Sequence, residues 1–139
     1  MKILVCILGS VGFSVLLDVP KNKLLYISFG ITLSAFVYEI SYSEKRAFVS
    51  AFAASLIINI FGEITARFIR TPSTVIILPS TIPLLPGSML FYSVNSLING
   101  KYTLFRHYLI LTAKTGLGIA LGALIGSVII ILLKELKRQ

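Results

Sequence analysis

Five long apolar runs, separated by short polar connections, constrain the fold of this chain more than any other feature of its sequence. The runs lie at residues 3–17, 24–40, 47–62, 74–98 and 108–133. An α-helix needs about 20 apolar residues, within a range of about 17 to 25, to cross the hydrocarbon core of a bilayer. The runs do not alternate apolar and polar side chains, as the strands of a membrane β-barrel do. The sequence therefore predicts an all-α, polytopic integral membrane protein with about five transmembrane helices.

The composition agrees with this class of protein and excludes others. Apolar residues make up 56% of the chain and charged residues 13%, whereas roughly a quarter of the residues in a soluble domain are charged. The 139 residues suffice for a single transmembrane domain, 1–139, and no linker marks a second one. With one cysteine and one histidine, the sequence has no metal-binding cluster, and it lacks a phosphate-binding glycine loop and a nucleophile–base–acid set. We therefore expect no enzyme activity, no cofactor and no metal site.

The basic residues lie between the apolar runs and give a formal net charge of +8. That arrangement is typical of membrane-protein loops and tails in contact with lipid headgroups, so we expect no nucleic-acid partner. The first run follows a short basic start, as in a signal peptide, but no small-residue cleavage site follows it, so we expect a retained span. Five spans would give one side these bases: Lys2, Lys45, Arg46, Lys101 and Arg106. The other side would carry Lys21, Lys23, Arg67, Arg70, Lys134, Lys137 and Arg138. The positive-inside rule then predicts a cytoplasmic C-terminus.

The fourth run carries a cluster of helix-breaking residues, Pro79, Pro83, Pro86 and Gly87. Each interior proline removes a backbone donor and clashes with the preceding turn. The backbone groups set free must be satisfied inside protein or by cavity water, because lipid offers no hydrogen bonds. We therefore predict two half-helices that meet at a break facing protein or a cavity, where a half-helix N-terminus favours an anionic substrate group. The alternative is a proline kink that only shapes helix packing.

Polar residues at the end of the third run form a second candidate site. Asn59, Glu63, Arg67 and Arg70 are spaced as i, i+4, i+8 and i+11, which places them on one helical face. Glu63 and Arg67 can pair along this face, and Asn59 requires an internal partner in lipid. Glu63 is a candidate for proton coupling or cavity polarity, and Arg67 for a gate or a contact with a substrate carboxylate. The alternative is a helix end whose charges extend to the lipid headgroups.

The fifth run carries a stripe of glycines at four-residue spacing, Gly118, Gly122 and Gly126. Small residues at this spacing let another helix approach closely, and that helix can belong to the same chain or to a partner. The stripe therefore predicts helix packing and no chemistry, and it is a candidate docking face for a second polypeptide.

A series of motifs runs through the third and fourth runs. They are Gly62-Glu63, Ala66-Arg67, Thr71-Pro72-Ser73-Thr74, Pro79, Ile82-Pro83-Leu84-Leu85-Pro86-Gly87 and Tyr92. Together these motifs resemble the threonine/serine exporter family, and in particular its short, C-terminal-type subunit with a Pro-x3-Pro-Leu-x-Pro-Gly core. Residues 12–21 also resemble the first span and loop of that subunit. Ser80 departs from the pattern, because many relatives have glycine there.

The resemblance implies a subunit of a secondary-active exporter in the cytoplasmic (inner) membrane of a bacterium, driven by an ion gradient. The implied substrates are small anionic or zwitterionic organic acids, either amino acids such as threonine and serine or dicarboxylates such as succinate. The resemblance also implies a partner, a larger subunit with a soluble N-terminal region and five further spans. The alternative function is a structural or pore-forming homo-oligomer, similar to a holin, which would require amphipathic spans without a broken helix.

Overall fold

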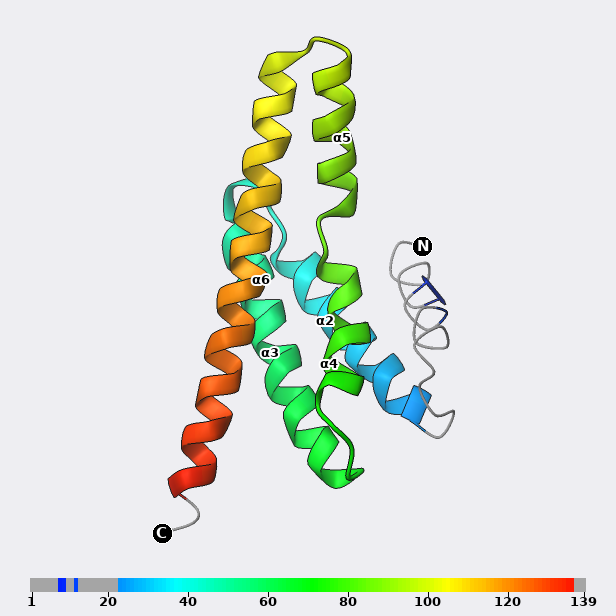
Figure 1. The fold of residues 1–139 in the computed structure, drawn as a ribbon, viewed down its shortest axis with the longest axis vertical. Helices are drawn as coiled ribbons and strands as arrows, with labels where there is room; N and C mark the ends of the chain where they lie inside the picture. The colour runs from blue at the N-terminus through cyan, green and yellow to red at the C-terminus, as the bar shows by residue number, and fades with distance from the viewer. Residues whose placement is uncertain (1–7, 10–11, 13–22, 137–139) are drawn as a thin grey trace.

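The structure describes residues 8–9, 12 and 23–136, and this part of the chain consists of helices and short connections (Figure 1). In this computed structural model the elements from Lys23 onward are α2 (Leu24–Ser41), the 3₁₀ turn η2 (Glu44–Arg46), α3 (Ala47–Phe68), α4 (Thr74–Thr81), the 3₁₀ turn η3 (Ile82–Leu84), α5 (Gly87–Ile98) and α6 (Tyr102–Leu136). The described residues contain no strand, which confirms the predicted all-α class.

The other helices pack on two sides of α3 (Figure 1). On one side α2 runs antiparallel to α3, and α4 packs on both of them. On the other side α6 runs beside α3 in the same direction, and α5 pairs with the first half of α6 as an antiparallel hairpin. With 35 residues, α6 is about 52 Å long, which exceeds the roughly 30 Å of a bilayer core. The α5–α6 hairpin accordingly extends past the ends of α2 and α3 (Figure 1).

Glycines on α6 let this helix lie directly against the backbone of α3. A Cβ atom added at Gly118 would be 2.5 Å from the carbonyl oxygen of Phe48, and one added at Gly122 would be 2.5 Å from that of Phe52. Gly126 continues the contact one turn later. The expectation that this stripe docks a second polypeptide is therefore wrong, because α3 of the same chain already covers it.

Two clusters of buried apolar side chains hold α4 and η3 on the α2–α3 pair. The first consists of Ile27, Ile31, Ala66 and Ile76. The second consists of Ala54, Ile58 and Leu84. The second cluster includes a residue of η3, so the chain stays packed against α3 up to the point where the helical path breaks.

The helices follow the predicted runs, but α3 exceeds its run at one end and α6 at both ends. α2 coincides with the run 24–40, but α3 continues six residues past 62 and α6 begins six residues before 108. Three of these helices are long and apolar enough to cross a membrane, and the bent pair α4–η3 and α5 supplies a fourth candidate span. The first predicted span, 3–17, lies outside the described residues apart from Leu8, Gly9 and Gly12.

α3 ends at a left-handed backbone turn and not where its apolar run stops. The amide of Thr71 donates to the carbonyl of Ala66 at 3.0 Å, and the amide of Arg70 donates to the carbonyl of Arg67 at 3.4 Å. This pattern closes a helix with one residue at positive φ, and Arg70 has φ 49°. Pro72 follows and cannot extend the helix. Arg70 therefore lies beyond the helix, and its predicted place on the same helical face as Asn59 is wrong.

Candidate functional site

The fourth predicted span is broken where its prolines are densest. α4 ends at Thr81, η3 covers Ile82–Leu84, and α5 begins at Gly87 after an extended residue, Leu85. The axes on the two sides of the break differ by 46°. The predicted pair of half-helices is thus confirmed, with Pro83 inside η3 and Pro86 at the N-cap of α5.

Buried side chains on α2 support the backbone just before the break. The Ser34 hydroxyl donates to the carbonyl of Ser80 at 2.8 Å, and both residues are fully buried. Pro83 lacks the amide that a regular helix would offer to the carbonyl of Pro79, and the amide of Ile82 donates to that carbonyl instead. A serine on a neighbouring helix is one of the groups that can satisfy backbone atoms near a proline break in a membrane.

A cavity of about 250 Å³ lies at this break. Its lining comes from the last turn of α2, from the break and from the first turn of α5: Tyr38, Glu39, Tyr42, Pro83, Leu84, Leu85, Pro86, Ser88 and Met89. Pro83 and Pro86 therefore face a cavity, whereas Gly87 is exposed and has open space where a Cβ would be. The structure combines an acidic group, two phenols and a helix N-terminus around one small hollow.

The first turn of α5 begins without a hydrogen bond from a capping side chain among the described residues. At a helix N-terminus the leading amides carry partial positive charge and favour an anion. At the C-terminal end of α2, burial and then the carboxylates of Glu44 and Glu39 raise the pKa of Tyr42 above the ordinary value of a phenol. The cavity thus offers donors on one side and the Glu39 carboxylate on the other.

Thr115 of α6 contacts Met89, one of the residues that line the cavity. It is fully buried, its hydroxyl donates to the carbonyl of Leu111 at 2.9 Å, and its oxygen lies 3.9 Å from the sulfur of Met89. Through Thr115, the long helix α6 contacts α5 at the level of the cavity.

Sequence reasoning missed three cavity residues at the C-terminal end of α2, of which Tyr42 directly follows the helix. Tyr38 and Tyr42 fit an interfacial aromatic belt, and Glu39 fits a charge at a span end. The one local signal was an acidic residue between two tyrosines on the last turn of a span. Nothing local in the sequence indicates that this turn lies opposite the proline break.

The residues of the second predicted site, Asn59, Glu63 and Arg67, lie in different surroundings. Asn59 is 3% exposed at the α3–α6 contact, where its side-chain amide donates to the carbonyl of Ser55 at 2.8 Å. Its Cβ would lie 2.8 Å from a Cβ at Gly126. Glu63 is half-buried and Arg67 is exposed. None of these three lines the cavity at the break.

Glu63 joins α3 to the start of α4. Its carboxylate accepts a hydrogen bond from the Ser73 hydroxyl at 2.7 Å. Among the described residues no ion pair connects Glu63 with Arg67, so the pairing expected along the helix is not formed. This hydrogen bond links Glu63 of α3 to the residue just before α4.

Ser73→Ala is expected to lower the free energy of unfolding by about 1 kcal/mol, because the partly buried Glu63 carboxylate loses a donor. Chemical unfolding of the purified chain in detergent measures the change. In a double-mutant cycle, Ser73→Ala and Glu63→Ala together should cost less than the sum of the two. Ser43→Ala is the control, since Ser43 is exposed and makes no side-chain capping bond. Strictly additive effects of the two substitutions would contradict a stabilising hydrogen bond between Ser73 and Glu63.

Comparison with protein families identifies the family to which the chain belongs. A family model described as threonine/serine exporter, ThrE, matches residues 2–129. The chain belongs to the threonine/serine exporter family. Comparisons with curated proteins and with solved structures found no match. The matched region of this exporter includes the broken span, the last turn of α2 and the three glycines of α6.

Membership in the threonine/serine exporter family confirms the resemblance carried by the motifs around the proline cluster. It makes the chain a multi-pass membrane protein of amino-acid export, in agreement with its apolar helices.

Proposed function

We propose that the cavity at the helix break binds the amino acid that this exporter moves. The observation that carries the proposal is the meeting of Glu39 with the start of α5 around one hollow of about 250 Å³. Pockets for drug-sized ligands measure roughly 300–1,000 Å³, so this one suits a small solute. Substrate sites at broken helices are a recurrent feature of secondary transporters.

The chemistry of the cavity matches a zwitterion. The uncapped first turn of α5 suits the α-carboxylate of an amino acid, because helix N-termini favour negative charge. The carboxylate of Glu39 suits the α-ammonium group. The hydroxyls of Tyr38 and Tyr42 supply hydrogen-bonding groups for a hydroxylated side chain such as that of threonine or serine.

The same geometry favours amino acids over dicarboxylates. A dicarboxylate such as succinate would bring its second carboxylate to the side of the cavity that carries Glu39. Like charges at close range disfavour binding, and no basic side chain of the described residues lines this cavity. We therefore place threonine and serine before succinate as substrates.

The setting of the transporter is the cytoplasmic membrane of a bacterium, with the C-terminus in the cytoplasm. The ends of α3 and α6 and the start of α2 lie at one end of the molecule (Figure 1), and this end carries Lys23, Arg67 and Arg70. Over the whole sequence the side of the C-terminus carries seven loop and tail bases and the other side five, and such an excess favours the cytoplasmic side. Transport is secondary-active and requires the larger subunit with its soluble N-terminal region and five spans, because many carriers are built from two related halves.

The test compares Glu39→Gln with the wild type in membrane vesicles that contain this chain and the larger subunit. Losing a charge-assisted hydrogen bond costs about 1.5–3 kcal/mol, which is roughly a 10- to 100-fold rise in the threonine concentration that half-saturates transport. Glu135→Gln is the matched control, because Glu135 is exposed near the end of α6. Excess succinate should not compete with threonine in the wild type.

Three outcomes would overturn the proposal. Unchanged threonine transport by the Glu39→Gln variant would remove the cavity from the substrate path. Competition by succinate as strong as that by serine would exclude the zwitterion arrangement. Passage of unrelated neutral solutes without a gradient would favour the holin-like pore.

A further inference from the structure

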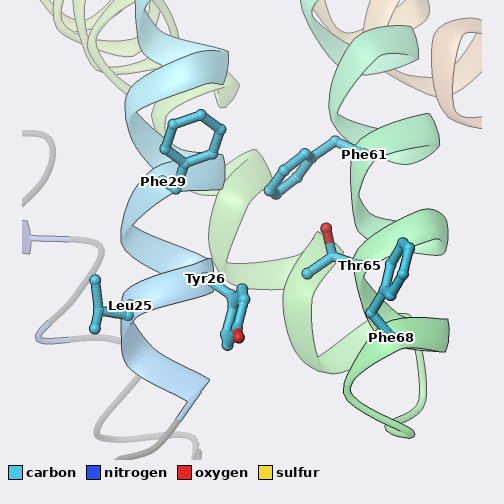
Figure 2. A pocket seen from close by; sticks show the side chains of 6 residues that line it. All are labelled: Leu25, Tyr26, Phe29, Phe61, Thr65 and Phe68. Atoms are coloured by element: carbon cyan, nitrogen blue, oxygen red, sulfur yellow. The ribbon is translucent and has the colours of Figure 1, made fainter.

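A second hollow, of about 720 Å³, lies between the start of α2 and the end of α3 (Figure 2). Six residues line it: Leu25, Tyr26, Phe29, Phe61, Thr65 and Phe68. Phe29 and Phe61 point toward one another from the two helices, with ring centroids 5.5 Å apart (Figure 2). The cavity proposed for substrate is lined by the other end of α2, so the two hollows are separate.

The lining of this groove is apolar and open to the outside. Among the residues that line it, Leu25 is 82% exposed, Phe29 62% and Phe68 84%. In a bilayer such a surface contacts lipid acyl chains, and aromatic rings around a long hollow offer contact along the length of a chain. The groove is therefore suited to hold an extended hydrocarbon.

Basic residues flank one end of the groove. Lys23 immediately precedes α2, Arg67 lies in the last turn of α3, and Arg70 follows that helix. Arg67 and Arg70 are exposed. The one acidic residue nearby on α3, Glu63, accepts a hydrogen bond from Ser73. The charge at this end is net positive, because the three bases outnumber this one carboxylate.

We propose that the groove binds an anionic phospholipid, with one acyl chain along the rings and the phosphate at the basic end. α2 spans 18 residues and is about 27 Å long, close to the thickness of a bilayer core. Its first turn, and with it the basic end of the groove, therefore lies at headgroup depth, while Phe29 and Phe61 lie deeper. Basic pockets between membrane helices bind anionic headgroups by this combination of charge and apolar contact. The site does not depend on the function proposed for the other cavity.

A single tryptophan can report on the groove, because the chain contains none. Phe61→Trp places the reporter in the lining, and the full chain is reconstituted in vesicles of phosphatidylcholine and phosphatidylglycerol. Quenching is compared when only one of the two lipids carries brominated acyl chains. We expect phosphatidylglycerol to be preferred about tenfold at this position.

Matched variants separate a lipid site from general contact with the bilayer. Adding Arg67→Gln and Arg70→Gln should reduce the preference to nearly none, whereas Lys101→Gln with Arg106→Gln, at the other end of the molecule, should leave it unchanged. Leu124→Trp, at a position 60% exposed on α6, should show no preference. Equal quenching by the two lipids at Phe61→Trp would overturn the proposal. So would weak quenching by both, which would mean that protein, such as the apolar run 3–17 or a second copy, fills the groove.

Discussion

Gly122→Ala is expected to destabilise the chain by about 2 kcal/mol and to lower its thermal unfolding temperature by roughly 5–10 °C. The added Cβ would lie 2.5 Å from the carbonyl oxygen of Phe52 and 3.0 Å from the Cβ of Ser55. The nearest atom belongs to the backbone, so α3 and α6 must move apart. The hydrogen bond from the Ser55 hydroxyl to the carbonyl of Ile119, 2.8 Å long, spans this contact and would lengthen. Thermal unfolding of the purified chain in detergent measures the effect.

Gly116→Ala is the matched control for this prediction. Gly116 lies on the same helix and is exposed, and a Cβ there would meet nothing within 4 Å. Alanine favours helix over glycine by about 1 kcal/mol, so this variant should unfold at the same or a higher temperature. Equal losses at the two positions would mean that α3 and α6 are not in close contact in the membrane protein.

Asn59→Asp is expected to cost about 3 kcal/mol or more at pH 8. Asn59 is 3% exposed, and its amide donates to the carbonyl of Ser55. An ionised aspartate of the same shape has no proton to donate and brings a buried negative charge against that carbonyl. At pH 5 the cost should fall, because a protonated carboxyl is neutral and can donate again. Unfolding of the variant in detergent at the two pH values measures the difference.

Asn95→Asp provides the comparison at an exposed position. Asn95 lies on α5, and its side-chain oxygen accepts a hydrogen bond from Asn99 at 3.1 Å. An aspartate keeps that acceptor in contact with the surroundings, so stability should change little and should not depend on pH between 5 and 8. A loss at Asn59→Asp that is the same at both pH values would contradict burial of this side chain.

The spans and the break could be predicted because their causes are local. Hydropathy over a window of about 20 residues reports whether a helix is stable in lipid, and α2 follows its run to within one residue at its end. A proline lacks its amide in any context, and the helical path breaks at Pro83 and Pro86, although Pro79 lies inside α4. The glycine spacing likewise indicated close helix packing.

The ends of helices and the hydrogen-bond partners of polar side chains were harder to predict. They depend on backbone and side-chain contacts that the hydropathy of the sequence does not report. Glu63 and Arg67 lower the hydropathy after Gly62, yet α3 continues until Arg70 adopts positive φ. The helical spacing of Glu63 and Arg67 suggested a pair, but the carboxylate meets Ser73 of the next connection.

The sequence alone determined that the chain is an all-α membrane protein with a span broken at its proline cluster, since these properties follow from side chains acting within one turn or one span. Only the tertiary structure decided which surfaces meet. It placed Glu39 and the two tyrosines of α2 opposite the break, and it covered the glycines of α6 with α3. Those juxtapositions join residues more than 40 positions apart, and their geometry is set by the packing of whole helices.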